Sequence, residues 1–400
     1  MRIIDRPMYM NKLMDVKNTP DIKVITGIRR SEKSRLIEQY AEILKQEDHA
    51  NVVHFNLRLK ENEALREGDA LYHAIRDRWQ KARTNYLLID EIQMCDGFEN
   101  VINSIHDEEL YDVYITGSNA FLLSSDLATL FGGRVFEISV FPFSFREYLT
   151  YYPSDDIDRS FDRYFQQGGM SGSYVYRKEK DANTYVQEVL RAAVLRDIEQ
   201  KYNIENENLI LMIVNYLMDI IGSETSVRNI ASKISSSSYQ ANDKTVGKYL
   251  TYLTRSFLFY PLKRYDIKGK AYLETNQKYY LADLSFRYAE LGRRFADRGH
   301  LFENLVALEL LRRDYEVYAG KLYQKEIDFV AIRDGTPMYI QVSDDITDEK
   351  TRKREVEPLL SIRDSYPKLL IARTKQEEMD LGGIRVMDIA RWLAEYYEAD

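Results

Sequence analysis

The first 150 residues alternate short apolar runs with longer stretches in which apolar residues recur at helical spacing. The apolar runs are Ile22–Ile28, Val52–Leu57, Tyr86–Ile92, Val113–Thr116 and Val135–Val140. Continuous rather than alternating apolar character is typical of strands that are buried on both faces. The amphipathic stretches between the runs, such as Lys33–Gln46 and Ala70–Arg83, predict helices. The pattern therefore predicts a parallel sheet with helices on both faces.

Beyond residue 150 the pattern becomes mainly helical. The polar stretch Pro153–Ser160 is typical of a linker. The most apolar stretch, Leu209–Ile221, is interrupted by Asn215 and Asp219 and is too short to cross a bilayer. We therefore expect a helical lid or linker region at residues 151–225, with a buried helix and no membrane span.

Two short amphipathic segments follow, Ile230–Ile234 and Val246–Phe257, separated by a serine-rich turn. In the second segment the apolar residues lie along one face of a helix. The strand-like Phe257–Tyr265 comes next. Two short helices followed by a strand predict a winged helix-turn-helix at residues 226–298.

The last part of the chain, residues 299–400, begins with the amphipathic segment Leu301–Arg312. The strand-like segments that follow are Tyr315–Ala319, Glu326–Ile332, Met338–Val342 and Lys368–Ala372. One helix followed by several strands predicts an α+β domain.

Composition narrows the class of protein. The 400 residues include 56 Lys and Arg against 64 Asp and Glu, a net charge of −8. Any nucleic-acid surface must therefore be local. The single cysteine, Cys95, excludes an internal disulfide and a cysteine-based zinc cluster. Together with the lack of a signal-peptide pattern, it predicts a cytoplasmic protein.

A phosphate-binding loop is predicted between the first strand and the first long helix, where the chain reads Gly27-Ile28-Arg29-Arg30-Ser31-Glu32-Lys33-Ser34. In a Walker A loop the backbone amides cradle the phosphates of ATP, the lysine reaches the β- and γ-phosphates, and the serine hydroxyl holds Mg²⁺. The alternative is a loop–helix junction that resembles this motif by chance. Glu32 stands where the motif has glycine, and its carboxylate adds about 4 kcal/mol of repulsion per unit charge at about 4 Å. Uncompensated, this repulsion weakens ATP binding about a thousandfold, but the cations of Arg29, Arg30, Lys33 and Mg²⁺ oppose it.

Two further elements support the phosphate loop. The apolar run Tyr86–Ile89 ends in Asp90 and Glu91, as a Walker B strand does. Asp90 would hold hydrated Mg²⁺, and Glu91 would orient or deprotonate the attacking water. A third element, Tyr114–Asn119, is another buried strand that ends in small polar residues, of which Asn119 would contact the γ-phosphate or position the water. The three elements in this order predict a P-loop NTPase core.

Arg134, next to Gly132 and Gly133, has two interpretations. It acts as an arginine finger on the transferring phosphoryl group, either in cis or across the interface of a homo-oligomer. Alternatively, it is a surface arginine at a turn.

The ordered set of motifs resembles prokaryotic AAA-type ATPases with the C-terminal domain of unknown function DUF4143. The motifs that carry the resemblance are Gly27–Ser34, Leu88–Gln93, Thr116–Asn119, Gly133–Arg134, Val140–Leu149, Gly168–Met170, Lys278–Asp283, Phe302–Asn304 and Glu326–Val330. The resemblance implies an ATP-binding AAA-like module at residues 1–150, fused to a winged-helix and nuclease-like C-terminal region.

The chain departs from the pattern of this family at Glu32 and at Arg35, where a threonine is usual. We therefore expect either a Mg²⁺-dependent ATPase or a non-hydrolysing pseudo-ATPase that serves as a DNA or protein adaptor.

A local cluster of positive charge lies in the predicted winged helix. From Lys244 to Lys270 there are seven basic residues and one acid. Lys244, Lys248 and Arg255 flank the apolar face of the second helix, where a recognition helix meets DNA. The alternatives are a solvated basic face and a surface that docks another protein.

Glu303, Asp328 and Gln341 resemble the acidic positions of a PD-(D/E)xK nuclease. Such an enzyme needs paired carboxylates for Mg²⁺ and a lysine that supports the attacking water. Gln341 replaces one acid and Ser343 replaces the lysine. The pattern therefore favours a vestigial nuclease-like fold, kept for scaffolding or binding, over a residual metal nuclease.

Overall fold

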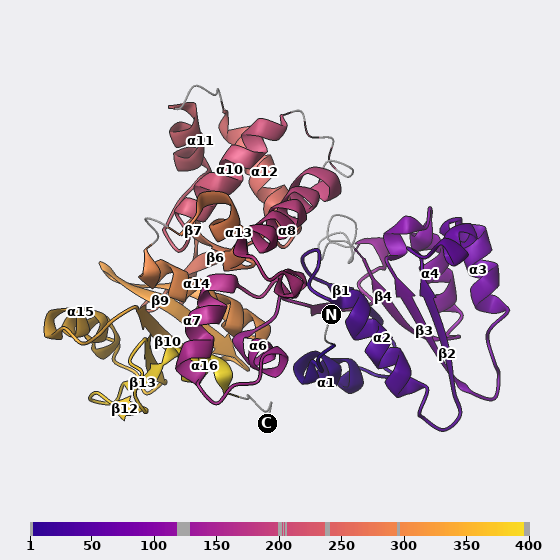
Figure 1. Cartoon of the computed structure of the whole chain (residues 1–400), viewed down its shortest axis with the longest axis horizontal. Coiled ribbons are helices and arrows are strands. Elements are labelled where there is room, and N and C mark those ends of the chain that lie inside the picture. The colour runs from indigo at the N-terminus through magenta and orange to yellow at the C-terminus, as the bar shows by residue number, and fades with distance from the viewer. Residues whose placement is uncertain are drawn as a thin grey trace. The chain divides into compact units, whose positions relative to one another are not determined.

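The computed structural model of the chain describes residues 3–117, 129–198, 202, 204, 206–236, 241–293 and 297–395. The chain forms two compact units (Figure 1). The first comprises Met1–Val140 with Asp197–Lys201, and the second comprises Phe141–Arg196 with Tyr202–Asp400.

The first unit contains a five-stranded sheet in the order β2-β3-β4-β1-β5. All of its neighbouring strands are parallel. The strands are β1 (Ile22–Thr26), β2 (Ala50–Asn56), β3 (Thr84–Asp90), β4 (Asp112–Thr116) and β5 (Val135–Ser139). The five apolar runs are therefore strands, as predicted, and the parallel α/β architecture is confirmed.

Helices pack on both faces of this sheet. They are α1 (Pro7–Asp15), α2 (Lys33–Leu44), α3 (Gly68–Arg76) and α4 (Phe98–Asp107), with short 3₁₀ turns η1 (Lys60–Arg66) and η2 (Ile92–Met94). α1 and α2 share one core with Ile25 and Leu88, whereas α3 and α4 share the other with Val24 and Leu87. Successive strand residues point to opposite faces, so a strand between two such cores needs apolar residues on both of its faces.

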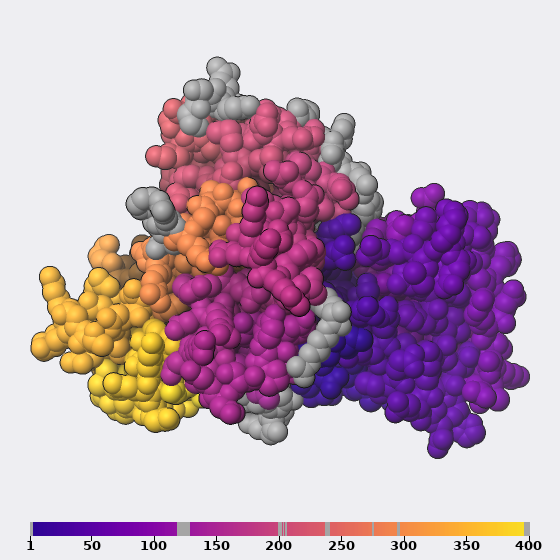
Figure 2. All heavy atoms as spheres, viewed as in Figure 1, coloured from indigo at the N-terminus to yellow at the C-terminus, as the bar shows by residue number. Residues whose placement is uncertain are grey.

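The second unit begins with helices. These are α6 (Phe145–Tyr151), α7 (Ile157–Gln167), η3 (Ser171–Val175), α8 (Glu179–Arg191), α10 (Glu207–Asp219), α11 (Val227–Ser235), α12 (Asp243–Arg255), α13 (Leu284–Leu291) and α14 (Arg298–Arg312). A π-helical stretch, η4 (Ala192–Asp197), follows α8. The atoms of residues 141–191, in magenta, form much of the face of this unit that is visible in Figure 2. Across the described part of the chain, no helix has the length and apolar character needed to cross a membrane.

The second unit also contains an eight-stranded mixed sheet in the order β12-β13-β11-β10-β9-β8-β6-β7. Its strands are β6 (Phe259–Asp266), β7 (Ala271–Leu281), β8 (Glu316–Leu322), β9 (Lys325–Arg333), β10 (Thr336–Ser343), β11 (Lys368–Ala372), β12 (Met379–Asp380) and β13 (Arg385–Asp388). Helices α15 (Glu349–Leu360) and α16 (Ile389–Ala394) complete the unit.

The hairpin β6–β7 follows α11 and α12, in the order expected for a winged helix. However, β6 also pairs in parallel with β8, with Arg264 opposite Ala319. The residues for which we predicted separate winged-helix and C-terminal domains therefore share one sheet.

A buried junction around Asp283 joins three of the motifs singled out in the sequence. The Asp283 carboxylate accepts hydrogen bonds from the backbone N–H of Gly169 at 2.5 Å and of Ser285 at 2.9 Å. The Phe143 N–H donates to the Gly169 carbonyl at 2.9 Å. A Cβ at position 169 would lie 2.2 Å from the Phe143 carbonyl oxygen, so only glycine fits there. These motifs therefore set the packing of the second unit.

Candidate functional site

The phosphate loop starts directly after β1 and ends where α2 begins at Lys33. Gly27 has φ = +134°, and a Cβ at this position would lie 2.0 Å from the carbonyl oxygen of Val140. The Val140 N–H in turn donates to the Thr26 carbonyl at 2.8 Å. The first glycine of the motif is therefore required by the close approach of Val140, in the segment directly after β5.

Glu32 immediately precedes α2 and has φ = 68° and ψ = 28°. This is the left-handed conformation that glycine adopts freely and that costs other residues about 1–2 kcal/mol. The loop thus has, at Glu32, the backbone conformation that suits the glycine of the motif. Glu32 therefore adds a negative charge to the loop and still adopts this turn.

The Lys33 side chain folds back onto its own loop. Its Nζ donates to the carbonyl of Gly27 at 2.7 Å and of Ile28 at 3.1 Å. Desolvation lowers the pKa of Lys33 to about 8, although the nearby carboxylates of Glu91 and Asp90 oppose this shift. The Lys33 ammonium is therefore held against its own loop, and burial is the main cause of its lowered pKa.

Asp90, at the end of β3, is completely buried. Its Oδ1 accepts hydrogen bonds from the hydroxyl of Ser34 at 3.1 Å and from the hydroxyl of Thr116. Its Oδ2 is buried and has no hydrogen-bond partner among the residues that the structure describes. Burial raises the pKa of Asp90, and the two hydroxyl groups oppose the rise. A carboxylate and a hydroxyl are oxygen ligands of the kind that Mg²⁺ and its bound water prefer, so the residues present fit this ion.

Glu91 follows Asp90 in a left-handed conformation, with φ = 58°. Its N–H donates to the Thr116 hydroxyl at 3.1 Å, and its carboxylate accepts from Gln93 Nε2 at 2.5 Å. Arg58 lies 3.7 Å from the other carboxylate oxygen. Thr116, at the end of β4, therefore holds both Asp90 and the backbone of Glu91, which follows β3, a role that the sequence did not reveal.

A cavity of about 150 Å³ opens at this edge of the sheet. Its lining residues are Arg29, Arg30, Glu32, Lys33, Ser34, Arg35, Arg58 and Glu91. Five cationic side chains and two carboxylates line it, a balance that favours an anion, although Arg29 and Arg35 are paired with Asp197 and Glu38 outside the lining. The cavity brings together most of the predicted ATP-binding residues and the predicted general base.

Two contacts from distant parts of the sequence support the loop. Arg6, before α1, is buried and donates to the Ser31 carbonyl at 2.8 Å. Arg29 forms an ion pair with Asp197 at 2.8 Å. Burial raises the pKa of Asp197, and Arg29 opposes the rise. No local motif marks Arg6 or Asp197, so these supports could not be found from sequence.

Arg134 lies at the amino ends of the strands, whereas the phosphate loop lies at their carboxyl ends. Its carbonyl accepts from the N–H of Ile22, at the amino end of β1, whereas the phosphate loop follows the carboxyl end of that strand. Five residues of strand separate the two ends by about 16 Å. Arg134 also forms an ion pair with Asp107. An arginine finger acting in cis is therefore wrong, and action across an oligomer interface stays a prediction. Asn119 lies outside the described residues.

The predicted nuclease-like residues form a hydrogen-bonded cluster in the second unit. Gln341 Nε2 donates to Glu355 at 3.0 Å, and Asp328 Oδ2 accepts from the Val342 N–H at 2.7 Å. Glu303 lies 3.4 Å from the ammonium of Lys278 and accepts from the Tyr280 hydroxyl at 3.1 Å. Burial raises the pKa of Glu303 and of Asp328. Within the described ranges, no three His, Cys, Asp or Glu residues are placed to hold a metal ion.

The predicted DNA-binding residues all lie on α12. Lys244 and Lys248 are exposed and one helical turn apart. Arg255, the last residue of the helix, is half-buried and donates to the Tyr202 hydroxyl at 3.5 Å. Of the three predicted DNA-binding residues, Lys244 and Lys248 are thus exposed to solvent on one face of α12.

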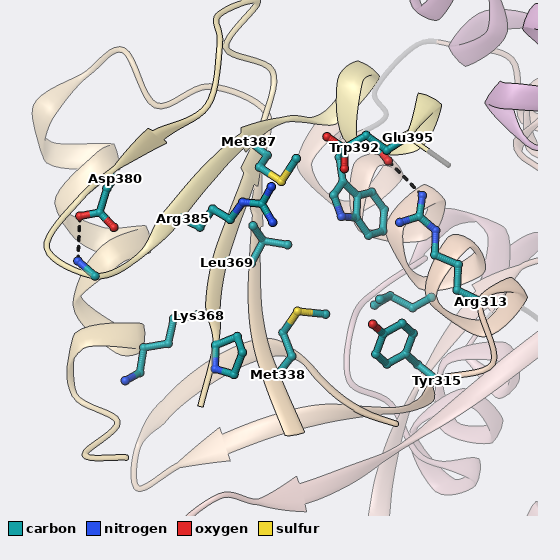
Figure 3. Close-up of a pocket in the computed structure, with 13 residues that line it drawn as sticks. Arg313, Tyr315, Met338, Lys368, Leu369, Asp380, Arg385, Met387, Trp392 and Glu395 are labelled. Carbon is teal, nitrogen blue, oxygen red and sulfur yellow. Dashed lines mark hydrogen bonds between the residues drawn. The ribbon is translucent and has the colours of Figure 1, made fainter. Parts of the chain in front are cut away.

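A separate cavity of about 200 Å³ in the second unit is drawn in Figure 3. Met338, Met387 and Trp392 point into it. Its cationic side chains already have protein partners: Arg313 donates to the Trp392 carbonyl, Lys368 to the Asp364 carbonyl and Arg385 to Glu378. These cations are therefore already engaged by the protein within the described part of the chain, and the lining also includes the carboxylates of Asp380 and Glu395.

Comparison with known families identifies the first unit. Residues 19–149 match the AAA domain family. With the parallel sheet and the loop after β1, this match makes the chain a protein with a P-loop ATPase-like AAA domain. Residues 158–297 match a domain of unknown function, DUF8612. The expected DUF4143 domain is therefore wrong. Two of the motifs that suggested DUF4143, Gly168–Met170 and Lys278–Asp283, have a structural part: they pack together around Asp283.

The chain is 35% identical over 398 residues to an uncharacterized protein of Haemophilus influenzae, with 98% of each chain covered. It belongs to the same family as that protein. An uncharacterized protein of Methanocaldococcus jannaschii is 24% identical over 372 residues, which cover 89% of this chain and 82% of the other. Among solved structures, a Walker-type ATPase of Pyrococcus abyssi matches with a TM-score of 0.49 and 13% identity, over 72% of this chain and 95% of the other.

Proposed function

We propose that the first unit binds ATP with Mg²⁺ at the carboxyl edge of its sheet and hydrolyses it. The observation that carries this proposal is the buried Asp90, whose Oδ2 lacks a partner among the described residues. This carboxylate accepts a hydrogen bond from Ser34, which lines a cavity rich in cations. Such a combination suits a triphosphate and its metal ion better than it suits a structural ion pair.

Each residue has a distinct part in the proposed reaction. The loop amides and Lys33 hold the phosphates, and Ser34 and Asp90 hold Mg²⁺. When bound, the ion neutralises charge on the β- and γ-phosphates. Glu91 accepts a proton from the water that attacks the γ-phosphorus in line, while the bond to the bridging oxygen of ADP breaks. Asn119, which lies outside the described residues, would orient that water or contact the γ-phosphate.

Calorimetric titration with Mg-ATP tests the site. Wild type is expected to bind, and Lys33→Ala to lose at least about 100-fold in affinity, because it removes the cation that reaches the β- and γ-phosphates. Lys45→Ala, at the exposed end of the same helix, is the control and is expected to bind as wild type does. Equal affinities for wild type and Lys33→Ala would place the nucleotide elsewhere.

The same titration of Glu32→Gly measures the effect of the Glu32 carboxylate on the triphosphate. Glycine keeps the left-handed turn and removes the negative charge. The affinity is therefore expected to rise, by up to about a thousandfold if nothing compensates the charge. An unchanged affinity would mean that the carboxylate is fully compensated by the surrounding cations.

The lowered pKa of Lys33 predicts that ATP binding is linked to proton uptake. Lys33 is largely neutral in the free protein above about pH 8, and a bound triphosphate favours its charged form. Binding at pH 9 should therefore take up about one proton, binding at pH 6.5 close to none, and affinity should fall as pH rises through 8. Titration in two buffers of different ionisation enthalpy measures the uptake. Lys33→Arg stays charged at pH 9, so the proton uptake should disappear in this variant. Wild type that binds ATP at pH 9 without proton uptake would contradict the prediction.

A second candidate function is DNA binding by α12, favoured by the exposed pair Lys244 and Lys248. The two lysines lie one turn apart on α12, the second helix of the pair α11 and α12. This arrangement suits contacts with the phosphates of DNA. The double variant Lys244→Glu, Lys248→Glu should lower the affinity for duplex DNA at least tenfold. It should also reduce the number of counterions released on binding, which is measured by the slope of log affinity against log salt concentration, by about two. Fluorescence anisotropy at several salt concentrations measures both. Lys350→Glu, Lys353→Glu, with the same charge change on α15, is the control. Equal losses in both double variants would favour a non-specific charge effect.

A further inference from the structure

The second unit contains a cavity of about 360 Å³ that the proposed ATPase reaction does not use. It is lined by residues from α6, α7, η3, α8 and α13, which lie mostly within the match to DUF8612. Its volume falls in the range of small-molecule sites in proteins. The cavity has three chemical features that point to the same kind of ligand.

The first feature is a pair of buried hydroxyl groups. Ser173 and Tyr288 line the cavity and are only 1% and 7% exposed. Neither Ser173 Oγ nor Tyr288 OH has a hydrogen-bond partner among the described residues. By contrast, the hydroxyl of Tyr152, in the same cavity, donates to the Tyr174 carbonyl at 3.2 Å. Buried polar groups are normally satisfied, so this pair indicates a polar ligand.

The second feature is unbalanced positive charge. Arg163, Arg177 and Arg293 line the cavity together with one acid, Glu179. Glu179 is engaged by Arg293 at 2.9 Å. Arg163 and Arg177 are exposed and form no ion pair within the described part of the chain. In a protein with a net charge of −8, two uncompensated guanidinium groups at one cavity favour an anion, and phosphate in particular.

The third feature is an aromatic and amide lining. Tyr152 and Tyr176 are 37% and 41% exposed, so parts of their rings remain available for stacking. Gln166 and Asn183 add amide groups to the same lining. Tyrosine rings stack on nucleobases, and side-chain amides bind the polar edges of bases. Among the described residues, the cations that line the cavity in Figure 3 have protein partners, and that lining has no such pair of unsatisfied hydroxyls.

We propose that this cavity binds a nucleoside phosphate. The base lies against the tyrosine rings, the phosphate is bound by Arg163 and Arg177, and the hydroxyls of Ser173 and Tyr288 hydrogen-bond to the ligand. Two sources supply this chemistry: a free nucleotide and the 5′-phosphorylated end of a single strand. The site is distinct from the phosphate loop and does not depend on ATP binding there.

The test uses the full chain carrying Lys33→Ala, which removes the contribution of the phosphate loop. Calorimetric titrations with AMP, with a 5′-phosphorylated pentanucleotide and with its unphosphorylated form separate the sources. Binding of AMP supports a free nucleotide, and binding of the phosphorylated strand alone supports a strand end. No binding of any probe at millimolar concentration overturns the proposal.

Variants of the lining distinguish a ligand site from a structural one. Tyr288→Phe removes a hydroxyl that has no described partner, so thermal stability should be unchanged or higher, while probe affinity falls about 3–10-fold. Arg163→Glu, Arg177→Glu should lower affinity at least tenfold, and Lys180→Glu, an exposed charge change on α8, should leave it unchanged. Affinity that is insensitive to both lining variants would place the probe elsewhere and overturn the assignment.

Discussion

Glu91→Gln is expected to keep Mg-ATP binding and to lower phosphate release at least about 100-fold. A positioned general base contributes about 10²–10⁴-fold, and an amide cannot accept the proton. The amide oxygen can still accept the hydrogen bond from Gln93, so the loop should keep its shape. Single-turnover phosphate release, together with calorimetric titration, measures the two properties separately. Glu61→Gln, on an exposed 3₁₀ turn, is the control.

This experiment also separates the ATPase from the adaptor. Wild type that binds ATP and releases no phosphate would be a pseudo-ATPase that uses nucleotide as a structural ligand. Wild type that turns over at the same rate as Glu91→Gln would show that another group deprotonates the water. Only a loss confined to turnover supports the assigned role of Glu91.

Gly169→Ala is expected to destabilise the second unit by about 3 kcal/mol or more. The added methyl group would lie 2.2 Å from the Phe143 carbonyl oxygen and 3.0 Å from Asp283 Oδ2, so the backbone must move. Movement weakens the hydrogen bond from Gly169 to the buried Asp283, which leaves a buried carboxylate less well satisfied. Urea unfolding followed by tyrosine fluorescence measures the change.

Gly247→Ala, within α12, is the matched control for this substitution. Its new methyl group would meet only a Val227 methyl group, at 3.7 Å. Alanine also favours a helix by about 1 kcal/mol, so this variant should be neutral or stabilised. Equal stability of the two variants would show that the Asp283 junction tolerates rearrangement.

The sheet of the first unit was predictable because its strands are apolar on both faces. Val24 and Ile25 enter different cores, and only a continuous apolar run satisfies both. The phosphate loop and the acids of β3 were predictable for a related reason. They follow carboxyl ends of parallel strands, which meet at one edge of the sheet.

Other features of the site depend on contacts that local sequence does not encode. Arg6 and Asp197 reach the loop from 25 and 168 residues away. Thr116 looked like one residue of a third strand, but its hydroxyl is shared by Asp90 and Glu91. The position of Arg134 could have been inferred, because a residue before β5 must lie at the amino edge of a parallel sheet.

The topology of the second unit was less predictable. A strand pattern shows that a segment is extended but does not specify its partner. The strand-like segment Phe257–Tyr265 was therefore assigned to a winged helix, although β6 also pairs with β8. Likewise, Gln341 was recognised as a departure from a nuclease, but its hydrogen bond to Glu355 on α15 depends on tertiary packing.

The pairing of Arg29 with Asp197 has a practical consequence for truncated proteins. A fragment that ends at residue 140 contains Arg29 but lacks the carboxylate that balances it. The anion cavity of such a fragment carries one extra uncompensated charge, and the fragment should therefore retain polyphosphates more tightly than the intact chain does. Nucleotide affinities measured on an excised AAA module would then overstate those of the whole molecule.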